Sequence, residues 1–138
     1  MRGVMSVFPR IREELQVVTS LPREEITLES HVYNDLLIDS IEIVELFTAL
    51  EEAFDLNLPN TVEDSYLETR ISGAWDAYKA KANNMMFQHF VVLEFPEIAS
   101  ERVEEMMKLC KKYQVQPFSV GFICAWIVQM LDSEANNV

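Results

Sequence analysis

Residues 35–46 of this chain read DLLIDSIEIVEL. An aspartate and a serine stand directly before an acidic and apolar pattern with helical spacing, at the end of a long stretch without periodicity. Asp39 followed three residues later by Glu42 has the form of a capping box, which predicts that a helix begins at Asp39 or Ser40. That position would hold the Ser40 hydroxyl out in solvent on a rigid platform. The arrangement suits covalent attachment better than a catalytic pocket.

The helix that follows is predicted to run to about residue 55 and to have two different faces. One face is an apolar stripe made of Ile43, Leu46, Phe47, Leu50 and Phe54. Residues 39–55 contain six acids and no base, and these acids lie largely off the stripe. Such a charge run usually only solvates a helix. Beside Ser40 we interpret it as a docking face for basic partners, because charge complementarity raises the rate of encounter.

The rest of residues 1–83 is also helical in pattern. An amphipathic helix is predicted over residues 4–19, and Pro22 blocks its continuation. Residues 20–38 form a long loop that scattered apolar residues pin to a core. A short helix is predicted over residues 62–68 and another over residues 70–82, with Thr69 as its cap. These elements predict an all-α fold, a small four-helix bundle.

Residues 84–138 have a different pattern, and a boundary is expected near Asn83 and Asn84. Residues 1–83 hold 16 acids and 7 bases, whereas residues 84–138 hold 7 acids and 4 bases. The segment FQHFVVLEF at residues 87–95 predicts a strand, and helices are predicted over residues 97–113 and 117–132. The last helix is apolar on most sides and must be covered. We expect this extension to pack on the bundle or to mediate self-association as a homodimer.

Composition restricts the class of protein. The 138 residues allow one ordinary domain or a small domain with an appendage, and 49% of them are hydrophobic. The net charge of −12 argues against nucleic-acid binding and favours basic protein partners. No signal peptide is apparent, and the longest apolar-leaning run, residues 118–131, is shorter than the ~20 residues of a membrane span. Cys110 and Cys124 lack metal-site spacing, which favours a reduced, cytoplasmic protein without a bound metal.

The histidines do not complete a catalytic set with Ser40. His31 and His89 are interpreted as a loop residue and a strand residue, and the chain has no GxSxG motif. Ser40 without a base is therefore predicted to be a poor catalyst but an adequate acceptor, because a modifying enzyme can supply the base. An Asp-Ser pair before an apolar run is most often only a helix cap. On that reading the protein is an unmodified acidic helical module that binds other proteins.

Over about residues 4–82 the chain resembles the acyl carrier protein family. The most specific part is DLLIDSIEIVELFTALEEAFDLNLP, residues 35–59. The resemblance implies a four-helix bundle with a long first loop and a short third helix. It also implies that Ser40 receives 4′-phosphopantetheine from a holo-carrier-protein synthase, which uses coenzyme A and Mg²⁺. The thiol of this arm would then carry an acyl group as a thioester, and the resemblance implies that the protein is not itself an enzyme.

The same resemblance assigns roles along the second helix. Acyl-loading and condensing enzymes with basic docking patches are the implied partners, besides the synthase. Recognition of the synthase and partners would involve Asp39, Ile41, Glu42, Val44, Glu45 and Thr48. The bundle interior, where an acyl chain would be sheltered, would be lined by Ile43, Leu46, Phe47, Leu50 and Phe54.

Two departures from the family pattern suggest a specialised carrier. The family usually has glycine where Leu37 stands and leucine where Ile41 stands, which favours a specialised fatty-acid, polyketide or lipid pathway. An aminoacyl carrier, D-alanyl or peptidyl, is the alternative within the same chemistry, and Asp39 favours an acyl or D-alanyl cargo. Residues 101–131 resemble a helix pair of condensation-type acyltransferase domains, but the His-His-x-x-x-Asp motif of those enzymes is missing.

Overall fold

The computed structural model describes residues 3–58, 66–81 and 85–136. Within these residues the protein is helical and has no strand, which confirms the predicted all-α class. The elements in chain order are η1 (Val4–Ser6), α1 (Phe8–Thr19), η2 (Arg23–Glu25), α2 (Ser40–Phe54), α3 (Thr69–Lys81), α4 (Phe87–Glu94), α5 (Ser100–Tyr113) and α6 (Val120–Asn136). The expected boundary at residues 83–84 and most of the expected short helix at residues 62–68 lie outside the described residues.

The first predicted helix is divided into a 3-10 turn and an α-helix. Pro9 lies in the first turn of α1, where its missing N–H costs nothing, and Val7 is the N-cap. Ile11 and Leu15 then face the core and are fully buried. Ser20 ends the helix in the left-handed conformation. The second predicted helix is confirmed as α2, whereas Thr69 is the first residue of α3 rather than its cap.

The strand predicted over residues 87–95 is wrong, because residues 87–94 form α4. Phe87, Phe90 and Val91 are its buried residues, and their spacing is that of a helix. Phe87 and Phe90 both contact the ring of Tyr78, with centroid distances of 5.3 and 5.5 Å. Packing against this aromatic cluster therefore overrides the strand preference of the β-branched and aromatic residues. His89 consequently lies exposed on a helix.

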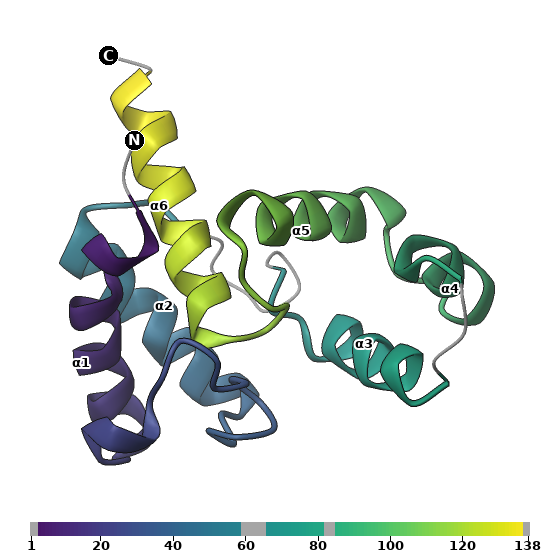
Figure 1. Cartoon of the computed structure of the whole chain (residues 1–138). Helices are drawn as coiled ribbons and strands as arrows, with labels where there is room; N and C mark the ends of the chain where they lie inside the picture. Colours follow the sequence, from purple (N-terminus) through teal and green to yellow (C-terminus); the bar gives the residue numbers. More distant parts are fainter. Residues whose placement is uncertain (1–2, 59–65, 82–84, 137–138) are drawn as a thin grey trace.

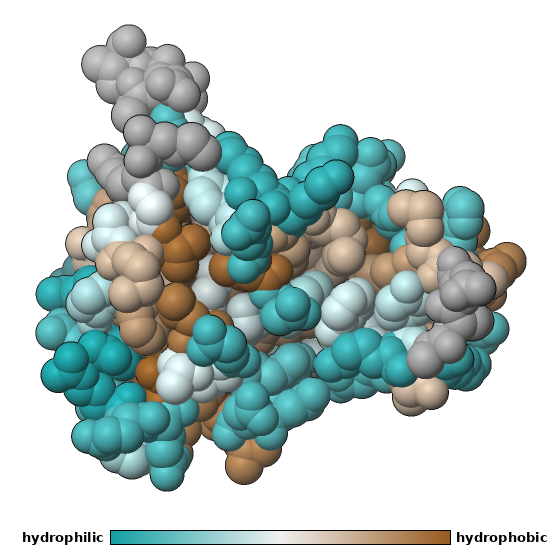
Figure 2. All heavy atoms as spheres, viewed as in Figure 1, coloured by the Kyte–Doolittle hydropathy of each residue, from teal (hydrophilic) through white to brown (hydrophobic). Residues whose placement is uncertain are grey.

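Two groups of helices lie side by side in the molecule (Figure 1). α1, α2 and α6 form a bundle, and α3, α4 and α5 form an arm beside it. The bundle thus differs from the expected one in its last helix: α6 packs on α1, and the helix expected at residues 70–82 packs with α4. Phe47 of α2 meets Trp126 of α6 edge to face at 5.3 Å. Hydrophobic residues are visible along the seam between α1 and α6 (Figure 2).

A buried carboxylate links two helices of the arm, and a neighbouring tyrosine connects them to α6 of the bundle. Glu68, directly before α3, accepts hydrogen bonds from Arg102 of α5 at 2.6 Å and from Arg70 at 2.8 Å. Tyr66 donates to Glu105 of α5, and its ring lies 6.5 Å from that of Trp126 in α6. The start of α3, α5 and α6 therefore meet at one junction. The two guanidinium partners offset the cost of burying the Glu68 carboxylate.

The two cysteines are core residues. Cys110 and Cys124 are free and buried, on α5 and α6. Burial raises the pKa of each thiol to about 12, so both stay protonated at neutral pH. They therefore act as small apolar side chains. Among residues 3–58, 66–81 and 85–136, no helix has both the length and the apolar composition needed to cross a membrane.

Candidate functional site

Ser40 lies at the point where the long loop meets α2. It is the first residue of the helix, and its side chain is exposed. Its hydroxyl makes no hydrogen bond with any residue that the structure describes. The structure therefore has an exposed serine at the start of this helix, as the sequence pattern predicts. A hydroxyl that is exposed and unbonded can be approached by another protein without unfolding of the site.

The capping box predicted from the sequence is formed, and it makes the helix start rigid. Oδ1 of Asp39 accepts the backbone N–H of Glu42 at 2.7 Å, and Oε1 of Glu42 accepts the N–H of Asp39 at 3.1 Å. Asp39 thus supplies the cap, so Ser40 does not have to. Its carboxylate also lies where the partial positive charge of the helix dipole favours an anion.

The loop before Ser40 is held by the C-terminal part of the chain. The backbone N–H of Val32 donates to the carbonyl of Phe118 at 2.8 Å, and those of Val120 and Gly121 donate to the carbonyls of Ser30 and Leu28 at 2.9 and 2.8 Å. An isolated antiparallel bridge pairs His31 with Ser119. Residues 118–121 are therefore part of the site's support.

Sequence reasoning missed this support, although one signal for it existed. Gly121 stands within an otherwise apolar helical run, and its backbone approaches the loop closely. A Cβ at this position would lie 3.1 Å from the carbonyl oxygen of Leu28 and 3.0 Å from Cγ1 of Val115. A glycine inside an apolar helix pattern often marks such a close approach.

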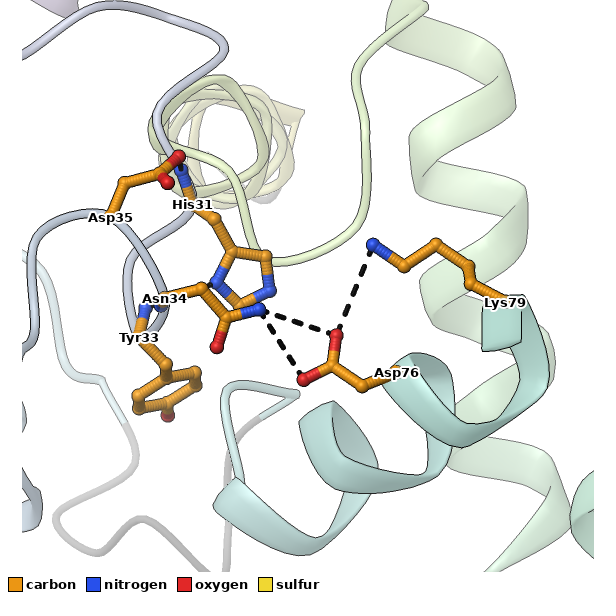
Figure 3. Close-up of polar contacts among 6 residues, drawn as sticks. All are labelled: His31, Tyr33, Asn34, Asp35, Asp76 and Lys79. Carbon is orange, nitrogen blue, oxygen red and sulfur yellow. Dashed lines mark hydrogen bonds and ion pairs between the residues drawn. The ribbon is translucent and has the colours of Figure 1, made fainter. Parts of the chain in front are cut away.

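A turn centred on His31 connects the loop to the arm (Figure 3). Nδ1 of His31 accepts the backbone N–H groups of Asn34 at 2.9 Å and Tyr33 at 3.2 Å. The side-chain amide of Asn34 donates to both carboxylate oxygens of Asp76 on α3 at 3.3 Å, and Lys79 lies 3.9 Å from Asp76 on the other side. The attachment loop therefore contacts both the bundle and the arm.

His31 is held in its neutral form by this environment. Desolvation by burial lowers its pKa from 6.5, and Lys79 acts in the same direction, while Asp76 and Asp35 oppose the shift. With Nδ1 accepting two N–H groups, the ring proton of the neutral form lies on Nε2, which has no hydrogen-bond partner among the described residues. The histidine is thus a structural acceptor, and neither of its ring nitrogens bonds to Ser40 in the described structure.

The residues expected to face partners do lie on the surface. Asp39, Ile41, Val44, Glu45 and Thr48 are exposed, and Glu42 is half-buried in the capping box. None of the six acids in residues 39–55 forms an ion pair within the described part of the chain. The acidic face is therefore available to a basic partner.

An apolar rim accompanies these acids. Leu37 is 75% exposed and Ile41 is 70% exposed, on either side of Ser40 in the sequence. Leu37 has φ of 56°, the left-handed region that glycine occupies without strain. The departures at these two positions thus change the surface next to the serine and leave the loop in the conformation that a glycine would take.

The residues expected to line the bundle interior are in the core. Ile43, Leu46, Phe47 and Leu50 are buried, and Phe54 is partly buried against the same core. Trp126 of α6 packs on Phe47 from the opposite side. None of the described pockets is lined by the four buried residues.

The site suits the covalent attachment of a group better than catalysis by Ser40. Ser40 has an exposed hydroxyl at a capped helix start, and no histidine is bonded to it in the described structure. The same residues contain no cluster of three or more His, Cys, Asp or Glu side chains arranged to hold a metal ion. A flexible prosthetic arm needs only an accessible hydroxyl oxygen on a rigid segment of the chain. Ser40 provides the oxygen, and the capped start of α2 provides the rigid segment.

Comparison with known proteins identifies this arrangement. Residues 9–62 match the family described as phosphopantetheine attachment site. The acyl carrier protein of Campylobacter curvus is 39% identical over 57 residues, which cover 41% of this chain and 74% of that protein. The acyl carrier protein of Bdellovibrio bacteriovorus is 33% identical over 75 residues, which cover 48% of this chain and 96% of that protein. The chain belongs to the acyl carrier protein family.

The predicted family is therefore confirmed, and so is its covalent cofactor, 4′-phosphopantetheine. An acyl carrier protein holds intermediates for other enzymes and is itself a carrier rather than an enzyme. No solved structure matches this carrier.

Proposed function

We propose that Ser40 is the residue that bears the 4′-phosphopantetheine arm. One observation carries the proposal: the exposed Ser40 hydroxyl stands at the start of a capped, acidic helix within the family-matched residues. No described residue forms a hydrogen bond with this oxygen, so the synthase would take its proton while the phosphodiester forms. The nucleotide part of coenzyme A would leave. The thiol of the arm would then carry the acyl group as a thioester.

Intact mass spectrometry tests the attachment site. The purified chain is incubated with a carrier-protein synthase, coenzyme A and Mg²⁺, and we expect the addition of one phosphopantetheinyl group. Ser40→Ala should abolish the addition. Ser100→Ala is the matched control, because Ser100 is also exposed and also the first residue of a helix, but follows Ala99 instead of a capping aspartate. Addition that persists in Ser40→Ala, or no addition to the unaltered chain, would refute the assignment.

The pathway proposed is a specialised fatty-acid, polyketide or lipid pathway in the cytoplasm. Leu37 and Ile41 support it, because they present a branched apolar surface beside the attachment point. Condensing and loading enzymes built for a smaller residue at position 37 would meet a steric obstacle there. Loading assays with fatty-acyl, D-alanyl and peptidyl-carrier enzymes would separate the acyl carrier from an aminoacyl carrier. Selective D-alanylation would contradict the acyl assignment.

The interior of the bundle is the proposed shelter for the acyl chain. Support comes from Ile43, Leu46 and Phe47, which are buried in the core, and from the contact of Phe47 with Trp126 of α6. A chain entering there would displace Trp126, which is 6% exposed. A change in Trp126 fluorescence on loading with a long acyl group, absent on loading with acetyl, is the expected result.

Residues 84–138 are proposed to form a C-terminal extension that packs on residues 1–83. The contacts of Phe118 and Trp126 support this arrangement. Self-association would use the far end of the arm, where Val92 and Leu93 are exposed and hydrophobic residues are visible at the edge of the molecule (Figure 2). Light scattering of the whole chain tests the homodimer. We expect the mass of a dimer for the unaltered chain and the mass of a monomer for Leu93→Glu.

A further inference from the structure

The arm contains a groove that the carrier function does not use. It lies between α3, α4 and α5, has a volume of about 440 Å³, and is formed by residues outside the family-matched segment. Its lining residues are Trp75, Tyr78, Met86, Phe87, Gln88, Glu104, Met107, Lys108 and Lys111. The volume falls within the range of small-molecule sites.

The wall of the groove is aromatic and is held in place. The rings of Trp75 and Tyr78 are stacked with centroids 5.6 Å apart, and Phe87 meets Trp75 edge to face at 5.0 Å. The hydroxyl of Tyr78 donates to the carbonyl of Met85 at 2.7 Å, which fixes this ring at the end of α3. A rigid aromatic wall offers contact area to an apolar ligand without a large ordering cost.

The methionines in the groove give it an adaptable surface. Met86 is 61% exposed and Met107 is partly buried, and both line the groove. Flexible thioether side chains adjust to irregular hydrocarbon shapes. The groove therefore suits a flexible aliphatic chain.

The lining of the groove carries two lysines and one glutamate, a net positive charge in a chain whose net charge is −12. All five lysines of the protein lie between residues 79 and 112, where six bases stand against five acids. Lys108 and Lys111 line the groove, and the ammonium of Lys79 lies 5.8 Å from the ring centroid of Trp75. Glu104 pairs with Lys108 at 3.2 Å, whereas Lys111 forms no ion pair with any described residue. The groove therefore offers an anion a cation that is not neutralised.

We propose that this groove binds the anion of an aliphatic carboxylic acid. Its hydrocarbon chain lies on Trp75, Phe87 and Met107, and its carboxylate lies at Lys111 and Lys108. The ligand is the free acid rather than the acyl group on the carrier's own arm, because a thioester has no negative charge for the lysines to attract. This binding does not depend on the attachment of an arm to Ser40.

Calorimetric titration with decanoate tests the proposal on the full chain carrying Ser40→Ala. That variant cannot receive an arm at the proposed site, so failure of the attachment assignment would not affect the result. We expect saturable binding of one decanoate, and binding about tenfold weaker for octanoate, because two methylene groups are lost from the apolar contact. Decanol should bind about tenfold more weakly than decanoate, since it lacks the charge.

Matched variants locate the site. The double variant Lys108→Gln with Lys111→Gln should weaken decanoate binding about tenfold and leave decanol unchanged. Lys112→Gln is the control, because Lys112 is in the same helical turn but does not line the groove. Met86→Asp should also weaken decanoate binding, since it adds an anion at the rim. Asp is favoured at this N-cap of α4, so the arm should remain folded.

Three results would overturn the proposal. The first is the absence of saturable binding while circular dichroism shows a folded chain. The second is binding that Lys112→Gln weakens as much as the groove-lysine double variant does. The third is equal affinity for decanoate and decanol, which would show a hydrophobic surface without a carboxylate site.

Discussion

At the scale of single residues, the loop next to Ser40 combines exposure with backbone strain. Leu37 adopts a left-handed backbone conformation, with φ of 56°, which is unfavourable for a residue with a Cβ. Its side chain is 75% exposed, so burial does not compensate for this strain. Val32 and Ile38, on either side, are buried and joined by a hydrogen bond from Ile38 N to Val32 O of 3.2 Å. The strain is therefore sustained by neighbours that fix the loop at both ends.

Replacing Leu37 by glycine should stabilise the protein. Leu37→Gly removes the left-handed strain and loses little packing, so the free energy of unfolding should rise by about 1 kcal/mol. Denaturant titration measures it. Leu37→Ala is the control, because alanine keeps the Cβ that causes the strain and should give no comparable gain. An unfolding free energy that falls with glycine would show that the exposed leucine contributes to packing.

His31 should make the attachment loop sensitive to acid. Its folded pKa is lowered below 6.5, so the unfolded chain binds the extra proton more readily, and stability falls as pH decreases through 6.5 towards the folded pKa. Above pH 6.5 His31 is neutral in both states, and its contribution to the free energy of unfolding is fully present. A proton on Nδ1 would also break the hydrogen bonds that this atom accepts from the N–H groups of Tyr33 and Asn34.

The matched variant for this prediction is His31→Asn. An asparagine oxygen can accept the same N–H groups and does not titrate, so the melting temperature of the variant should fall less than that of the unaltered chain between pH 7 and pH 5. Asp35, Asp76 and Lys79 face the imidazole in both proteins, so the difference between the two curves isolates the histidine. Parallel curves would contradict the role of His31.

At the scale of elements, the site depends on the contact between the loop and the start of α6. Gly121 allows that contact, since a Cβ there would lie 3.1 Å from the carbonyl of Leu28. Gly121→Ala should therefore push α6 from the loop and cost about 1–3 kcal/mol, as overpacking does. Hydrogen exchange at Val32, whose N–H bonds to Phe118, should become faster.

Gly73→Ala provides the opposite case in the same protein. Gly73 lies inside α3, and a Cβ added there would meet no atom within 4 Å, so alanine should stabilise the helix by up to about 1 kcal/mol. Exchange at Val32 should stay unchanged in that variant. If Gly121→Ala behaves like Gly73→Ala, the proposed close contact does not limit the position of the loop.

The acidic face of α2 should determine how quickly partners bind. Glu45→Lys reverses one exposed charge near Ser40, so binding to the synthase at low salt should weaken about tenfold, and its dependence on ionic strength should become smaller. Surface plasmon resonance at several salt concentrations measures both. Glu97→Lys makes the same charge change on an exposed residue away from α2 and serves as the control. Equal effects would mean that only the net charge matters.

The elements differ in how far the sequence alone determines them. α2 could be predicted with its cap, because Asp39 and Glu42 act locally. α4 could not, since Phe87 and Phe90 favour a strand until the rings of α3 are placed beside them. The support from residues 118–121 consists of backbone hydrogen bonds, which leave almost no trace in side-chain pattern.

At the scale of the whole molecule, the choice between two helices is decided by tertiary contacts. α3 and α6 both have apolar faces, and the sequence alone favoured the nearer one as the last helix of the bundle. In the structure α6 supplies Phe122 and Trp126 to a shared core with α1 and α2. Its buried surface runs almost continuously from Phe118 to Val128, which exceeds what the Ile71 face of α3 offers. Burial of apolar area therefore favours α6.

Removal of the extension should consequently destabilise the carrier bundle itself. Each large buried aromatic contributes about 3–5 kcal/mol, so losing Phe118, Phe122 and Trp126 together is comparable to the whole stability of a domain, about 5–15 kcal/mol. A fragment ending at residue 84 should lose cooperative thermal unfolding and associate through its exposed core. Circular dichroism and light scattering measure both, with a chain shortened only after residue 134 as the control. Adding a peptide of residues 117–136 should restore cooperative unfolding. A monomeric fragment that melts like the full chain would show instead that residues 69–81 can take the place of α6.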